Sequence, residues 1–81
     1  MRVTQFSNNH FIVSDEEGNL FFQSYEKVIL KKTREGKIFL DPYFWDYSKT
    51  TSRNRQLFLQ ETRKETLGKI QIGLYEFKCL N

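Results

Sequence analysis

The chain has 81 residues, of which 38% are hydrophobic and 28% are charged, and its 13 basic and 10 acidic residues give a net charge of +3. This length fits one domain, residues 1–81, and excludes two independent cores. Eight Phe, four Tyr and one Trp supply the bulky apolar surface that a small core needs, which excludes a disordered tail.

Simple features of the sequence also bear on disulfides and membranes. Cys79 is the only cysteine, so no internal disulfide can form, and its place in an alternating pattern predicts a small buried residue. No stretch approaches the roughly 20 apolar residues of a membrane span, and the first residues lack the apolar run of a signal peptide. We therefore expect no membrane contact and a cytoplasmic location.

The first half of the chain predicts two β-hairpins. Each joins two β-rich runs through a polar turn, and Gly18 in the first turn suits a positive φ. The expected strands cover residues 10–14, 20–25, 27–32 and 37–40, and residues 3–6 are a candidate first strand.

A dense aromatic stretch follows these hairpins. Asp41 and Pro42 end the last strand, because proline has no N–H to continue the ladder. The aromatic residues that follow are Tyr43, Phe44, Trp45 and Tyr47. We expect Phe44 and Trp45 to form an aromatic plug buried between sheet and helices, while the two tyrosines keep their hydroxyls at its rim.

The first of two predicted helices begins after this stretch and extends to about residue 60. Three hydroxyl residues are candidate N-caps, namely Ser48, Thr50 and Thr51. Leu57 and Phe58 are expected to be buried. The residues expected to point outward are Arg53, Arg55 and Gln56.

A capping box predicts the start of the second helix, with Thr62 as the cap and Glu65 at the third helical position. Its apolar residues recur at i, i+3 and i+7 as Leu67, Ile70 and Leu74. Gly73 is a natural C-cap for this helix.

Residues 74–80 then alternate as a final strand, which places Tyr75, Phe77 and Cys79 on one side. Strands followed by two helices and a strand predict an α+β domain. We expect a small, mostly antiparallel sheet of four to five strands, with the two consecutive helices before the last strand.

Catalytic and metal-binding patterns find little support in the sequence. His10 and Cys79 stand far apart, without zinc spacing, and His10 is interpreted as an ordinary strand or surface residue. No nucleophile has a base nearby, and no glycine-rich phosphate loop is present. Asp41 and Asp46 suit turn and capping roles better than a pair of catalytic carboxylates. We therefore predict a protein that is not an enzyme and that holds no metal or cofactor.

Charge is distributed unevenly along the chain. One basic and four acidic residues fall within residues 1–26, whereas twelve basic and six acidic residues follow. Such asymmetry can mark an anionic partner, although ordinary solvating surface charge gives the same pattern.

The segment around the start of the first helix is the candidate binding site. Hydroxyls and free N–H groups at a helix start suit an anion, basic side chains add charge, and tyrosines offer stacking faces. A solvated basic helix face that needs no ligand is the alternative. The candidate binding residues are Tyr43, Tyr47, Lys49, Arg53, Arg55, Arg63 and Lys64, and the lysines that could extend this patch are Lys27, Lys31, Lys32 and Lys37.

Several runs of the sequence carry a resemblance to a known family. They are F-F-Q-S-Y-E-K-V-I (21–29), G-K-I-F-L-D (36–41), W-D-Y-S-K-T-T-S (45–52), F-L (58–59), K-E (64–65), K-I (69–70), G-L-Y (73–75) and the terminal L-N. On these runs the chain resembles a family of small uncharacterised proteins from phages and prophages of low-GC Gram-positive bacteria. The likeness is densest at W-D-Y-S-x-T-T, and the family supplies no catalytic or binding residue to carry over.

The resemblance implies a phage accessory protein that acts in the host cytoplasm by binding. We expect its function to be protein–protein contact with a host or defence factor. A nucleic-acid-binding module that uses the basic helix face is the first alternative, with an affinity that falls steeply with salt. A virion or assembly component that self-associates is the second.

Overall fold

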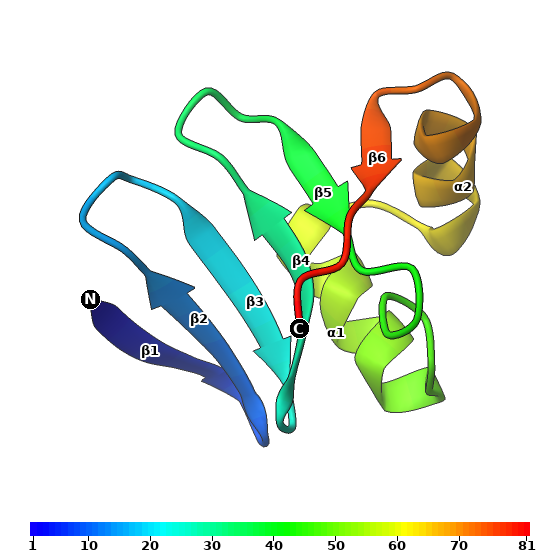
Figure 1. Ribbon diagram of the computed structural model, residues 1–81. Coiled ribbons are helices and arrows are strands. Elements are labelled where there is room, and N and C mark those ends of the chain that lie inside the picture. The colour runs from blue at the N-terminus through cyan, green and yellow to red at the C-terminus, as the bar shows by residue number, and fades with distance from the viewer.

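The computed structural model describes residues 1–81 and contains one sheet with two helices beside it (Figure 1). The strands are β1 (Arg2–Ser7), β2 (His10–Ser14), β3 (Leu20–Ser24), β4 (Lys27–Lys32), β5 (Ile38–Leu40) and β6 (Tyr75–Phe77), and the helices are α1 (Lys49–Leu59) and α2 (Arg63–Gln71). These bounds confirm the predicted hairpins and the two consecutive helices before the last strand. Neither helix is long and apolar enough to span a membrane.

The strands lie side by side in the order β1-β2-β3-β4-β5-β6. Neighbours from β1 to β5 pair antiparallel, because short turns join them. β6 pairs parallel with β5, because α1 and α2 carry the chain back along the sheet. The α+β class and the mostly antiparallel sheet are confirmed. The sheet has six strands rather than four to five, since β1 pairs along its length with β2 and the short β6 adds the other edge.

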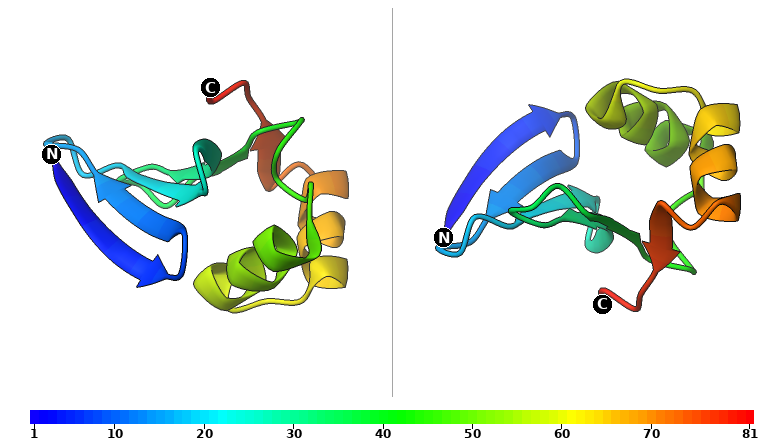
Figure 2. Two further views of the ribbon diagram at one scale, coloured as in Figure 1. Left: turned by 90° about the horizontal axis from the view of Figure 1, so that it is seen from below. Right: turned by 90° about the horizontal axis from the view of Figure 1, so that it is seen from above.

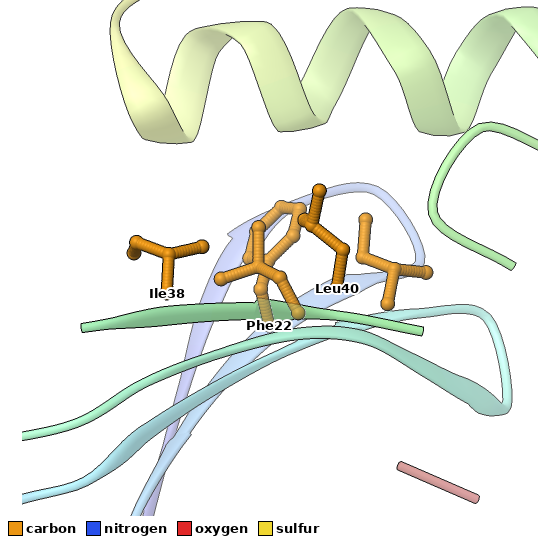
Figure 3. Close-up of a cluster of buried hydrophobic side chains, with 5 residues drawn as sticks. Phe22, Ile38 and Leu40 are labelled. Carbon is orange, nitrogen blue, oxygen red and sulfur yellow. The ribbon is translucent and has the colours of Figure 1, made fainter. Parts of the chain in front are cut away.

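Both helices cover the same face of the sheet, as the two views of Figure 2 show. Side chains alternate between faces along a strand, so directly paired residues such as Phe22 and Leu30 point the same way. Figure 3 shows Phe22, Ile38 and Leu40 pointing from the sheet toward a helix. The buried apolar residues that form the core are Phe22, Ile29, Leu30, Ile38 and Leu40.

Aromatic rings fill the space between this sheet face and the helices. Phe58 of α1 stacks on Phe22 with ring centroids 4.6 Å apart, and Phe6 meets Phe22 edge-on at 5.1 Å. Such pairs add about 0.5–1.5 kcal/mol beyond the area they bury. Phe44 and Trp45 also pack against the core, but both stay partly exposed. The predicted aromatic plug is therefore in place, although it is only half buried.

Asp41 ties the end of β5 to two other segments. The residue is completely buried, and its Oδ1 accepts the backbone N–H groups of Tyr43 and Phe44 at 2.9 and 3.1 Å. Its Oδ2 accepts the N–H of Leu80 and the side-chain amide of Asn81 at 2.9 and 3.0 Å. One carboxylate therefore fixes both the aromatic turn and the C-terminal tail against the sheet.

The C-terminal tail also completes one edge of β4. β5 pairs only with the last three residues of β4, from Leu30 to Lys32, so the backbone of Val28 has no strand partner on that side. Asn81 takes this place: its Oδ1 accepts the N–H of Val28 and its Nδ2 donates to the carbonyl, both at 2.8 Å. A single amide side chain thus imitates one residue of a neighbouring strand.

Both helices begin at residues that the sequence indicated. The Ser48 hydroxyl accepts the N–H of Thr51 at 3.1 Å and caps α1, and Thr62 with Glu65 forms the capping box of α2. At the end of α2, Gly73 has a φ of +82°. This left-handed conformation lets the next residue, Leu74, donate its N–H to the carbonyl of Lys69 at 2.9 Å.

Leu57 is 62% exposed and not buried as predicted. The residues of α1 that face the sheet follow helical spacing but are mostly polar, namely Thr51, Asn54, Arg55 and Phe58. Because hydrogen-bonding groups rather than apolar ones set the inward face, the apolar pattern pointed to the wrong side of the helix for Leu57.

The final strand is shorter than predicted. β6 ends at Phe77, which is 48% exposed, and Cys79 is exposed rather than buried. The cause lies in the tail, which leaves the line of β6 after Lys78 and crosses to Asp41, where Leu80 donates its N–H to the carboxylate. Leu74 is also 59% exposed, because it follows the last turn of α2 instead of belonging to it.

Lowering the pH should test the role of Asp41. Burial by itself disfavours its charged form, but the hydrogen bonds from Leu80, Tyr43, Asn81 and Phe44 outweigh burial and lower the pKa of this carboxyl. A carboxyl whose pKa is lowered on folding stabilises the protein above the pKa of the unfolded chain, and this stabilisation is lost as the pH falls through the folded-state pKa.

We expect Asp41→Asn to lower the free energy of unfolding by about 2–4 kcal/mol at neutral pH, because an amide cannot accept all four hydrogen bonds. The difference from the wild type should begin to shrink below about pH 4, where the carboxyl of the unfolded chain becomes protonated, and should continue to shrink as the pH falls through the lower folded-state pKa. Urea unfolding followed by Trp45 fluorescence between pH 7 and 2.5 measures both quantities. A difference that stays constant over this range would contradict the assignment.

Candidate binding surface at the start of helix α1

A shallow depression of about 470 Å³ lies where the first turns of α1 meet the start of α2. No hydrophobic residue lines it. Its lining residues are Asp46, Ser48, Lys49, Ser52, Arg53, Gln56 and Arg63. The structure thus brings together three of the predicted binding residues, and adds polar groups that can accept or donate hydrogen bonds.

Asp46 holds α1 and the start of α2 together at this depression. Its Oδ2 accepts the Nε of Arg63, from α2, at 2.6 Å, and its Oδ1 accepts Nη1 of Arg55, from α1, at 2.9 Å. Burial alone would raise the pKa of Asp46, but the hydrogen bonds from Arg55, Arg63 and Ser52 lower it below its ordinary value. The carboxylate therefore stays charged and positions Arg63 beside α1.

Arg55 was predicted to point outward, and this prediction is wrong. The side chain is completely buried. Its Nη1 donates to the carbonyl of Trp45 at 2.7 Å as well as to Asp46, and its guanidinium lies 4.7 Å from the centre of the Trp45 ring. A planar cation that stacks on indole and forks to two oxygens can be buried where lysine could not. Arg55 thus belongs to the support of the surface and cannot meet a partner.

The other predicted binding residues are divided between places. Lys49 and Arg53 are exposed at the depression, whereas Lys64 is exposed outside it. Tyr43 is 75% exposed but does not line the depression. Tyr47 packs edge-on against Phe44 at 5.6 Å and directs its hydroxyl toward the carbonyl of Ser24. The basic residues and the stacking tyrosines expected together are therefore not assembled into one site.

The strand lysines do not extend this patch. Lys31 lies opposite Phe21 and Phe39 on the neighbouring strands. It follows the core residue Leu30, so its side chain lies on the face of the sheet away from the helices. Lys27 sits over the Phe44 ring at 5.2 Å, and Lys32 lies at the far end of β4. The sequence could not show this separation, because it depends on the pleat of each strand.

A buried chain of hydroxyls beneath α1 was not predicted. His10 belongs to strand β2, one of the two places that the sequence offered for it, and is completely buried rather than at the surface. Its Nδ1 donates to the carbonyl of Asn8 at 2.8 Å, which leaves Nε2 to accept the hydroxyl of Ser24 at 2.9 Å. Ser24 in turn meets Thr51 of α1 at 2.7 Å. Although a serine lies beside a histidine, neither side chain reaches solvent, and the chain of hydrogen bonds serves to join two strands to α1.

A second network missed from the sequence lies under the start of α2. Glu61 is buried. Its Oε2 forms an ion pair with Lys69 at 2.6 Å, and its Oε1 accepts the hydroxyls of Tyr75 at 2.7 Å and Thr66 at 3.1 Å. The interaction with Glu61 raises the pKa of Lys69. The pKa of Tyr75 is raised first by burial of its hydroxyl and second by the hydrogen bond to the Glu61 carboxylate.

This network borders the largest concave feature, a partly apolar groove of about 580 Å³. Its lining residues are Leu20, Lys32, Gly36, Ile38, Phe58, Leu59, Gln60, Lys69, Leu74 and Tyr75. Because Lys69 already pairs with Glu61, the charge at this end of the groove is balanced within the protein. No three His, Cys, Asp or Glu side chains come together in the structure as a metal site would need.

Two arginines on α1 offer a matched test of these assignments. We expect Arg55→Ala to lower the free energy of unfolding by about 3–5 kcal/mol, because it leaves the partly buried Asp46 without its fully buried partner and removes the cation from Trp45. Arg53→Ala should change it by less than about 0.5 kcal/mol, since its side chain is exposed. Urea denaturation of both variants measures the difference, and equal losses would show that Arg55 does not hold the surface.

Comparison with known proteins gives one match. Residues 1–73 match a family described as a family of unknown function (DUF8033). No match is found among curated proteins or among solved structures. The match covers both helices, the first five strands and the whole depression at the start of α1. The chain therefore belongs to the family of unknown function DUF8033.

Proposed function

We propose that this protein is a non-enzymatic binding module that contacts an acidic partner protein through one ridge of α1. The ridge consists of Lys49, Arg53 and Leu57, which follow one another at intervals of four residues and are all exposed. The carrying observation is Leu57, an apolar side chain that is 62% exposed one turn after Arg53. A basic and apolar ridge at this spacing matches the way in which helices dock into grooves of partner proteins.

The chemistry of the depression beside the ridge supports the same kind of partner. Arg53 and Arg63 both border it, and a guanidinium can hold a carboxylate through two parallel hydrogen bonds. Asp46 already neutralises part of this charge. A nucleic-acid site here would gain from stacking faces, but neither Tyr43 nor Tyr47 lines the depression. These features favour a protein over a nucleic acid at this surface.

The setting we propose is a phage or prophage of a low-GC Gram-positive bacterium, with the protein acting in the host cytoplasm on a host or defence factor. This rests on the resemblance at W-D-Y-S-x-T-T. In the structure this string is the support of the ridge: Trp45 stacks on Arg55, Asp46 pairs with it, and Ser48 caps α1. Small phage proteins commonly act by binding, and a rigidly supported helix ridge suits such contact.

Affinity capture from a lysate of a low-GC Gram-positive host tests the proposal. The ridge variant combines Arg53→Glu with Leu57→Ser. The matched control combines Lys64→Glu with Ile72→Ser, which makes the same changes at exposed residues away from the ridge. We expect the wild type and the control to retain one acidic protein that the ridge variant loses, with affinity reduced more than about tenfold in a purified binding assay.

The same assay separates the alternatives. Equal capture by the ridge variant and the control would overturn the proposal. Binding of duplex DNA that collapses between about 50 and 200 mM salt and disappears in the ridge variant would identify this surface as a nucleic-acid site instead. Self-association of the purified wild type at micromolar concentration, lost in the ridge variant, would indicate an assembly component.

A further inference from the structure

The face of the sheet away from the helices carries a row of aromatic and basic side chains. Phe21, Lys31 and Phe39 lie directly opposite one another on β3, β4 and β5. Each is next in sequence to a buried core residue, so the alternation of the strand points it away from the helices. Both views of Figure 2 show the helices on one side of the sheet only. This open sheet face therefore has no layer of secondary structure over it.

Lysine ammonium groups sit over the two phenylalanine rings. Lys31 Nζ lies 5.5 Å from the centre of the Phe21 ring, and Lys37 and Lys78 lie 5.1 and 5.3 Å from that of Phe39. Contacts of this kind at an exposed site are weak. A planar group of a partner can therefore displace the ammonium groups and stack on the faces of these rings.

The charge of the open sheet face is positive. Lys37 pairs with Glu76 at 2.6 Å, whereas no ion pair is formed by Lys31 or Lys78. A third phenylalanine, Phe11, lies on the same face one strand further, paired with Gln23. The face thus combines partly exposed aromatic rings with two lysines that form no ion pair. An anionic partner can bind these lysines without breaking an existing ion pair.

We propose that the open sheet face binds single-stranded nucleic acid. A base stacks on the ring of Phe39 and another on Phe21, two strand spacings apart, or about 10 Å. The displaced ammonium groups of Lys31 and Lys78 then turn to the phosphates that join the bases. Stacking of bases on aromatic side chains beside basic groups is the general mode of single-strand recognition. A duplex would keep its bases stacked inside and could meet only the lysines.

This surface lies on the opposite side of the sheet from the ridge of α1, so the two proposals are independent. The acidic turn at residues 15–17 borders one end of the face, where Asp15 lies close enough to interact with Lys31. Its charge repels phosphates there and leaves the end toward Lys78 as the more favourable path for the strand.

Fluorescence anisotropy with labelled 12-nucleotide single strands of mixed-sequence DNA and RNA, and with the matching DNA duplex, tests this inference. We expect both single strands to bind more tightly than the duplex at about 50 mM salt. Phe39→Leu, which keeps an apolar side chain but removes the flat ring, should weaken single-strand binding by about tenfold. Lys31→Gln combined with Lys78→Gln should reduce the slope of log affinity against log salt by about 1.4.

The variant Lys64→Glu with Ile72→Ser changes exposed residues outside both surfaces, so it serves as the control and should bind single strands as the wild type does. Thermal unfolding by circular dichroism confirms that each variant is folded, and the lysine variant carries the test if Phe39→Leu is not. The inference is overturned if no single strand binds at the lower salt. It is also overturned if the duplex binds as tightly, or if folded variants of the open sheet face bind unchanged.

Discussion

The buried carboxylate of Asp41 is the constraint on which the arrangement of the other elements depends. It stands where the sheet ends and the aromatic turn begins, and its two oxygens face two different parts of the chain. One oxygen accepts hydrogen bonds from the turn that leads to α1. The other binds the C-terminal tail, whose last residue completes the edge of β4. A neutral side chain of the same size could not satisfy four donors. The path into α1 and the path out of β6 are therefore fixed at a single point.

The charged groups beyond Asp41 are of two kinds: some are buried and support the binding surface, and others are exposed on it. Arg55 is enclosed by Trp45 and Asp46, so its charge is used inside the protein. Arg63 shares the same carboxylate but keeps its side chain half exposed. Arg53 has no such partner and faces solvent. Three arginines close together in sequence and space thus have three different roles, which depend on their geometry relative to one aspartate.

Local signals allowed most of the fold to be predicted from sequence. Turn glycines, the Asp-Pro stop and the capping residues Ser48 and Thr62 act within a few residues, so they mark where elements begin and end. Which side of an element faces inward depends on partners distant in the chain. Leu57 and Arg55 were assigned to the wrong sides because the inward face of α1 is set by hydrogen-bond partners outside the helix, Ser24 for Thr51 and Asp46 for Arg55, and not by its own apolar pattern. For the same reason, the sequence could not show that the predicted tyrosines and strand lysines lie away from the site.

The hydroxyl chain beneath α1 has a consequence for how this helix can act. Apolar contacts have no direction, so a helix held by them alone can rotate slightly or slide with little cost. The bonds from His10 through Ser24 to Thr51 are directional, and any rotation of α1 would leave buried polar groups without partners. The orientation of α1 is therefore specified before any partner arrives. A surface that needs no reordering loses little conformational entropy on association, so even a small contact area can give useful affinity.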